Sequence, residues 1–87
     1  MVELKIAIIK WIDSTYYKIE EGLVSSLPKI IKPRILTSSG ILVYEDEESV
    51  CICQDLEPTE EYTRFVLTIP KISISYLDIF TKKIEEN

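Results

Sequence analysis

The amino-acid sequence predicts a mainly β fold, built from five short antiparallel strands in a single domain over residues 1–87. Runs rich in Ile, Val, Leu and Tyr alternate with turns, which is typical of strands. The most regular pair of runs, 40–44 and 49–53, flanks an acidic turn at 45–48 and predicts a hairpin. Strict alternation of side chains over 62–69 adds a further strand.

The expected strands lie at 4–12, 34–44, 49–56, 62–69 and 74–80. Both faces of the first are apolar, with Ile6 and Ile8 on one side and Ala7 and Ile9 on the other, which indicates a strand covered on two sides. Gly40 is a candidate for a bulge or bend. Pro70 cannot donate to a ladder, so strand four ends there. We expect the polar tail 81–87 to fray.

Residues 15–32 form the least regular stretch. Its apolar residues have the spacing of one helix face, and they are Tyr16, Ile19, Leu23 and Leu27. Gly22 weakens this helix prediction and Pro28 ends it. We expect a short helix or a long loop between strands one and two, and long insertions often carry function. A long first loop, two hairpins and a single turn before strand five are the layout of an SH3-like or Sm-like small barrel. The alternative is a plain five-stranded antiparallel sheet with a helix across one face.

The acidic balance of the chain limits its partners. The net charge is −5 and the pI about 4.7, which argues against binding duplex nucleic acid or an anionic membrane. No apolar run reaches the ~18–20 residues of a membrane span, and the start does not resemble a signal peptide, so we expect a cytoplasmic protein. A core this small favours a homo-oligomer.

The sequence offers few groups for catalysis. It has no histidine, the usual general base near neutral pH, and no nucleophile elbow, phosphate loop or zinc spacing. Cys51 and Cys53 lie two residues apart on one strand face, and we interpret them as reduced thiols that fill space rather than bind metal. We therefore expect no enzymatic activity, no cofactor and no metal site.

Three basic residues and three aromatic residues are the candidates for a ligand site. If the turn before strand five approaches the first loop, it brings Arg34, Arg64 or Lys71 near aromatic rings, namely Trp11, Tyr16 and Tyr17. A guanidinium binds phosphate and an aromatic ring stacks on a base, so this combination predicts a small anionic nucleotide. The alternative is that Trp11 belongs to the core and that the basic residues pair with surface carboxylates.

Three stretches resemble a group of small phage-encoded proteins: 10–14 (KWIDS), 39–52 (SGILVYEDEESVCI) and 68–74 (TIPKISI). That group shares a W-[ILV]-D-S first strand, an acidic central hairpin and an I-P-[KR]-x-x-I exit. The resemblance implies a phage protein with an SH3-like or Sm-like barrel, acting in the host cytoplasm. By analogy of size and class, some compact phage proteins are oligomeric sponges for the cyclic nucleotides of host defence.

Two hypotheses follow. In the first, a homo-oligomer forms shared pockets that sequester a small anionic, cyclic nucleotide immune signal, which Arg34, Arg64 and Lys71 hold by its phosphates. In the second, the chain is a protein–protein adaptor or host-takeover inhibitor that acts through its acidic surface, 45–48.

Overall fold

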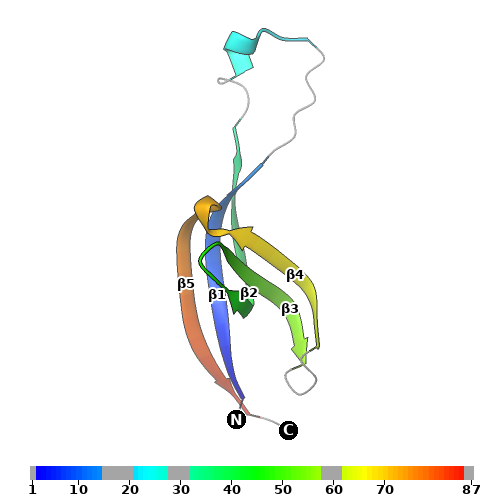
Figure 1. Ribbon diagram of the computed structural model, residues 1–87, viewed down its shortest axis with the longest axis vertical. Helices are drawn as coiled ribbons and strands as arrows, with labels where there is room; N and C mark the ends of the chain where they lie inside the picture. Colours follow the sequence, from blue (N-terminus) through cyan, green and yellow to red (C-terminus); the bar gives the residue numbers. More distant parts are fainter. Residues whose placement is uncertain (1, 15–20, 28–31, 58–61, 86–87) are drawn as a thin grey trace.

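The protein is mainly β, with five antiparallel strands in one sheet (Figure 1). The computed structural model describes residues 2–14, 21–27, 32–57 and 62–85. The strands are β1 Val2–Asp13, β2 Arg34–Glu45, β3 Ser49–Glu57, β4 Tyr62–Pro70 and β5 Ile74–Ile84, with short 3-10 helices at η1 Val24–Ser26 and η2 Lys71–Ser73. Their order across the sheet is β4-β3-β2-β1-β5. The predicted mainly β fold is confirmed. In this strand order β4 and β5 lie at the two ends of the sheet and do not pair with each other.

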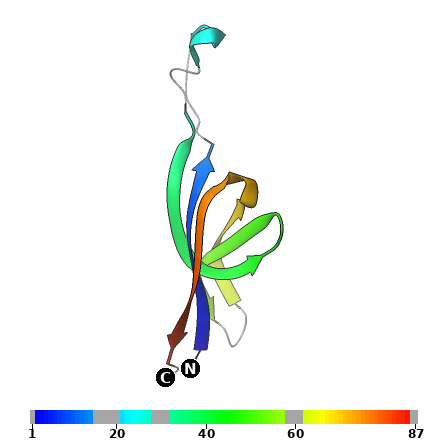
Figure 2. The same ribbon diagram turned by 90° about the vertical axis from the view of Figure 1, so that its left-hand side faces the viewer.

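The fifth strand corrects the predicted fraying of the tail. β5 continues to Ile84 because the start of β1 pairs with it, from Lys5 opposite Thr81 to Val2 opposite Ile84. The two ends of the described chain therefore lie side by side (Figure 2). The other four strands begin and end within a residue or two of their predicted bounds.

β2 is shared between the two halves of the sheet. Its first part, Arg34–Ile41, pairs with β1, and its last part, from Ile41, pairs with β3. Gly40 lies where the partner changes, and a Cβ atom there would lie 2.8 Å from the Cys53 carbonyl oxygen. The ladder irregularity lies between Leu42 and Tyr44 instead. Gly40 thus permits a close approach of β3, whereas the bulge predicted for it lies two residues further on.

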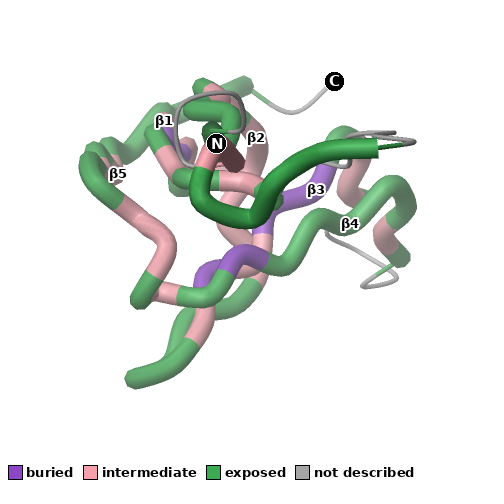
Figure 3. The backbone as a smooth tube through the Cα atoms, turned by 90° about the horizontal axis from the view of Figure 1, so that it is seen from above, coloured by how far each residue is buried: buried purple, intermediate pink, exposed green. Residues whose placement is uncertain are grey.

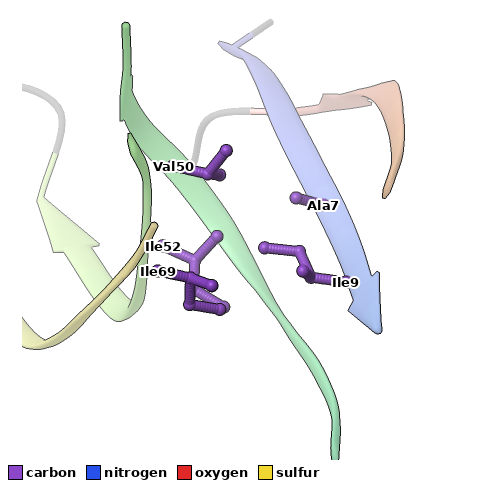
Figure 4. Close-up of a cluster of buried hydrophobic side chains, with 5 residues drawn as sticks. All are labelled: Ala7, Ile9, Val50, Ile52 and Ile69. Atoms are coloured by element: carbon purple, nitrogen blue, oxygen red, sulfur yellow. The ribbon is translucent and has the colours of Figure 1, made fainter. Parts of the chain in front are cut away.

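The core is small and lies between the two halves of the folded sheet. Five buried apolar side chains form it, from β1, β3 and β4: Ala7, Ile9, Val50, Ile52 and Ile69 (Figure 4). Trp11, Leu42 and residues of β5 pack around this cluster. Most other described residues are exposed or half-buried (Figure 3). The burial of Ala7 and Ile9 confirms the face assigned to them from the sequence.

The connection between β1 and β2 is described in part. Within 21–27 the structure contains the single turn η1, and Leu23 just before it is extended and 73% exposed. The predicted helix face through Leu23 is therefore wrong, because no apolar surface meets this side chain. Leu27, from the same predicted face, is half-buried and has helical φ and ψ angles. The predicted face residues Tyr16 and Ile19 lie outside the described residues.

Candidate functional site

The acidic turn between β2 and β3 is fixed by its own aspartate. Asp46 Oδ1 accepts hydrogen bonds from the backbone N–H groups of Glu48 and Ser49, both at 2.8 Å. The Tyr44 hydroxyl donates to Asp46 Oδ2 at 3.0 Å. An aspartate that binds backbone N–H groups two and three residues ahead closes a turn without help from the rest of the protein. The sequence Glu45-Asp46-Glu47-Glu48 therefore forms one defined conformation, and the charges of Glu47 and Glu48 are exposed to water.

These hydrogen bonds also set the protonation behaviour of the turn. The backbone N–H groups of Glu48 and Ser49, followed by the Tyr44 hydroxyl, lower the pKa of Asp46 because they stabilise its charged form. The same Tyr44–Asp46 hydrogen bond, together with the Asp46 charge, raises the pKa of Tyr44. At neutral pH the turn therefore carries an ionised Asp46 and a neutral Tyr44.

The turn η2 is attached to the acidic turn. The Lys71 backbone N–H donates to the Glu48 carbonyl oxygen at 2.7 Å, and Lys71 Nζ lies 2.9 Å from Glu45 Oε2. Pro70 ends β4 immediately before, and its fixed φ limits the freedom of the chain there. Ile72, the next residue after Lys71, is 96% exposed. The fold thus holds a large apolar side chain in water on a turn fixed from both sides.

A hollow of about 430 Å³ lies between the two turns. One side of it is apolar, formed by Pro70 and Ile72, and the other is acidic, formed by Glu47 and Glu48. Neither of these two glutamates forms an ion pair within the described residues. The hollow can therefore accept an apolar group and a cation side by side. We call this surface the turn pair, comprising residues 45–49 and 70–72.

The aromatic candidate Trp11 belongs to the edge of the core. Its indole Nε1 donates to Ser38 Oγ at 3.0 Å, and its ring packs against the buried cluster. The residue is half-buried, so the core covers part of its surface. The other two aromatic candidates, Tyr16 and Tyr17, lie outside the described residues.

The basic candidates do not converge within the single chain. Arg34 pairs with Asp13 at 3.6 Å where β2 begins, and Arg64 pairs with Asp55 at 2.6 Å across β3 and β4. Lys71 is held at the turn pair by Glu45. Figure 1 shows the start of β2 and the start of β4 toward opposite ends of the sheet. This arrangement matches the alternative in which basic residues pair with carboxylates, and a pocket shared between copies would have to rearrange these pairs.

Two larger hollows lie on the sheet, and neither is lined by Arg34, Arg64 or Lys71. The first, about 530 Å³, is lined mainly by apolar residues and reaches β4 at Phe65 and Leu67. The second, about 650 Å³, lies between the start of β1 and the middle of β2. Both are lined mainly by apolar residues, and the lining of the second also includes the charged residues Glu3 and Lys5.

The cysteines are free, as the sequence predicts. Cys53 is buried, and Cys51 Sγ lies 3.2 Å from Thr68 Oγ1 on the neighbouring strand. Within the described part of the chain, no three residues of the kinds that hold metals gather together.

Sequence reasoning missed the turn pair as a single surface. The acidic turn was visible, and so was Pro70-Lys71, but the two were not connected with each other, although the predicted hairpin of 49–56 with 62–69 places the start of one strand beside the end of the other. Ile72 was placed in the turn between strands four and five, but an isoleucine in a turn gives no sign of how far it is exposed. The available signals were that hairpin and the opposite charges of Glu45 and Lys71.

The comparisons with known proteins add no relative to this picture. No family model, no curated protein and no solved structure matches the chain. Among the described residues, no helix is long and apolar enough to cross a lipid bilayer. The function therefore has to be argued from the geometry of the protein itself.

Proposed function

We propose that this chain is a non-catalytic protein-binding domain, an adaptor or inhibitor whose contact surface is the turn pair. The observation that carries the proposal is Ile72, which is 96% exposed on a turn fixed by Lys71. Binding energy at protein interfaces is concentrated in a few apolar or aromatic anchors surrounded by polar residues. An anchor that is already rigid loses little conformational entropy when it binds.

The chemistry of the hollow defines the kind of partner. Pro70 and Ile72 offer apolar contact, and Glu47 and Glu48 offer charges with no ion pair of their own within the described residues. A protein segment with an apolar side chain next to a lysine or arginine complements both. Electrostatic attraction would also speed its encounter with a chain of net charge −5.

Sequestration of a cyclic nucleotide has less support from the geometry. The three basic residues that would hold the phosphates, Arg34, Arg64 and Lys71, are each paired with a carboxylate, and the pairs lie at different places in the fold. It stays a prediction, as do the phage origin and the cytoplasmic location. A thermal-shift screen with cyclic di- and trinucleotides tests it directly, because a ligand at 100 times its Kd adds about 2.7 kcal/mol of stability.

A peptide-display selection tests the protein-binding proposal. The full chain is used as bait, and the affinities of selected peptides are measured by fluorescence polarisation. We expect enriched peptides to carry an apolar residue beside a lysine or arginine. Ile72→Asp and Glu48→Lys should each weaken binding by at least about tenfold, equivalent to ~1.4 kcal/mol.

Val24→Asp is the matched control for the selection. Val24 is 81% exposed on the other 3-10 turn, η1, far along the chain from the turn pair, so this variant should bind as the wild type does. Selection of acidic peptides, or peptides that bind Ile72→Asp unchanged, would refute the turn pair as the contact surface. Stabilisation by a nucleotide with no peptide enrichment would favour the first hypothesis instead.

A further inference from the structure

Regular strand pairing is interrupted beside the first of the two larger hollows on the sheet. β3 pairs with β2 as far as Cys53 opposite Ile41, and the ladder does not continue to the next residue, Gln54. The ladder of β3 with β4 also omits Gln54, although it contains both neighbours, Cys53 and Asp55. Gln54 therefore has no partner in the ladders of the described strands, and it lines the hollow.

By the register of that ladder, Phe65 of β4 lies level with Gln54 and lines the same hollow. Its φ of 57° is a left-handed conformation that is costly for a bulky residue, and the residue is 67% exposed. The Arg64 guanidinium carbon lies 5.4 Å from the centre of the ring, and Asp55 holds that guanidinium at 2.6 Å. These contacts limit the movement of the ring. Strained residues of this kind cluster at ligand-binding and switch sites.

The hollow has the size and lining of a site for a small molecule. Its volume is about 530 Å³, within the range of roughly 300–1,000 Å³ that such sites occupy. Most of its lining is apolar, from Ile6 of β1 to Leu67 of β4, and Ser39 and Gln54 add neutral hydrogen-bonding groups. None of the described residues that line it is charged. A charged ligand would lie there without an opposite charge, at a cost in desolvation, so the lining favours an uncharged one.

The exposed ring and the interrupted ladder define the chemistry of the ligand further. A flat aromatic ring can stack on the ring of Phe65 or meet its edge, which are the favoured arrangements of aromatic pairs. Because the Phe65 ring is already held by Arg64, it loses little conformational freedom when a ligand packs on it. A carboxamide presents an acceptor and a donor side by side, as the peptide group does. It can therefore pair with backbone N–H and C=O groups at the level of Gln54, where the strands do not pair regularly with each other.

We propose that this hollow binds a small, uncharged aromatic carboxamide, with its ring packed against Phe65 and its amide hydrogen-bonded to the backbone at the level of Gln54. The bound molecule joins β2, β3 and β4 at the point where their own ladders stop. The inference does not depend on the proposed function, because the hollow and the turn pair share no lining residue within the described part of the chain.

Benzamide is a probe with this chemistry, and two analogues of similar size are its controls. Benzoate replaces the amide with a carboxylate, and cyclohexanecarboxamide replaces the aromatic ring with a saturated one. In titrations of isotope-labelled protein followed by NMR, we expect benzamide to bind with a millimolar Kd and each analogue to bind at least about fivefold more weakly. The backbone amide signals of Ser39, Gly40 and Gln54 should shift, and those of the turn pair should not.

Two pairs of variants locate the site. Phe65→Leu removes the aromatic ring and should weaken benzamide binding at least about fivefold. Phe80→Leu makes the same change on β5, outside the lining of the hollow, and should leave binding unchanged. Ser39→Phe places a ring in the hollow and should abolish binding, whereas Thr37→Phe, two residues earlier on the same face of β2, should not. Since Ser39 is exposed, its variant keeps the fold and the test remains decisive even if Phe65→Leu does not fold.

Each part of the proposal can fail separately in these titrations. A wild type that shows no benzamide binding at about ten times the expected Kd would refute the site. Benzoate that binds as tightly as benzamide would refute the preference for an uncharged ligand, and cyclohexanecarboxamide that does so would refute packing on the Phe65 ring. Binding that survives Ser39→Phe, or signal shifts confined to the turn pair, would refute the hollow as the place where the probe binds.

Discussion

Replacing Gly40 with alanine tests how the two halves of the sheet come together. The new Cβ would lie 2.8 Å from the Cys53 carbonyl oxygen and 3.2 Å from Ile52 Cβ. The first contact is with backbone in the middle of β3, and Cys53 is 2% exposed, so no flexible group can turn away. Either β2 and β3 must separate or Gly40 must shift relative to its partner Ala7.

The expected loss of stability is about 2 kcal/mol. Overpacking a well-packed core by one carbon costs roughly 1–3 kcal/mol, and contact with backbone favours the upper half of that range. Alanine recovers about 0.4–1 kcal/mol by restricting the unfolded chain. Gly40 does not have a positive φ, so no backbone strain adds to the cost. For a domain of this size, 2 kcal/mol corresponds to a fall in Tm of about 8–16 °C.

Urea unfolding followed by the fluorescence of Trp11, the single tryptophan, measures this change. Ser39→Ala is the matched control, since Ser39 is the exposed neighbour on the same strand, and we expect a change within about 0.5 kcal/mol. A Gly40→Ala protein as stable as the Ser39→Ala protein would refute the close approach of β3 to β2 at this point.

Three further predictions concern the core, an edge and the acidic turn. Ile69→Ala should lower the free energy of unfolding by about 2–5 kcal/mol in urea titrations, because Ile69 is fully buried; a loss below about 1 kcal/mol would contradict its place in the core. Phe65→Asn should change the unfolding free energy of dilute protein by less than about 1 kcal/mol, since asparagine tolerates the positive φ and this gain offsets the lost ring contacts. A larger loss would show that the ring stabilises the folded chain. Asp46→Ala should destabilise the protein at pH 7. The pKa of Asp46 is lowered by folding, so its contribution is present above its ordinary value of 3.8 and is lost as pH falls through the lower folded value. The stabilities of wild type and Asp46→Ala should therefore converge below about pH 4, and an equal difference at pH 7 and pH 2 would contradict the role of the carboxylate.

Local patterns in the sequence were enough to locate the strands. Alternation around Ala7 and Ile9 reflects which side chains point inwards, a property that depends on neighbours two residues away. Along 62–69 the alternation located the strand but not its buried side, because Phe65 and Leu67 are exposed and Ile69 is the buried residue of that stretch. The extension of β5 to Ile84 was missed because its polar residues give no strand signal. They are ordered by pairing with the start of β1, at the other end of the sequence. The predicted helix face through Leu23 was wrong although its sequence pattern was present. The helical spacing of apolar residues needs a surface to pack against, and Leu23 has none among the described residues.

The candidate site was harder to predict, because it depends on contacts between distant segments. The charges of Arg34, Arg64 and Lys71 were visible, but the carboxylates that pair with them were not. Two of those pairs follow from ladder register, Asp13 opposite Arg34 and Asp55 opposite Arg64. The register of each strand pair is set by the whole sheet. A prediction from residue types alone therefore grouped Arg34, Arg64 and Lys71, which the fold separates.

The pairing of β1 with β5 has a consequence for how the chain reaches its structure during synthesis. Ribosomes add about 5–20 residues per second, so β1 leaves the ribosome several seconds before β5 does. During that interval the apolar side of Ile9 lacks its opposite residue on β5, Leu77. The hairpins made by β2, β3 and β4 join neighbouring segments and are expected to form earlier, because short loops lose less entropy on closing. The edge of β1 that faces β5 therefore stays unpaired until the last strand arrives, although β2 can already pair with its other edge, and an unpaired strand edge is open to aggregation during that interval.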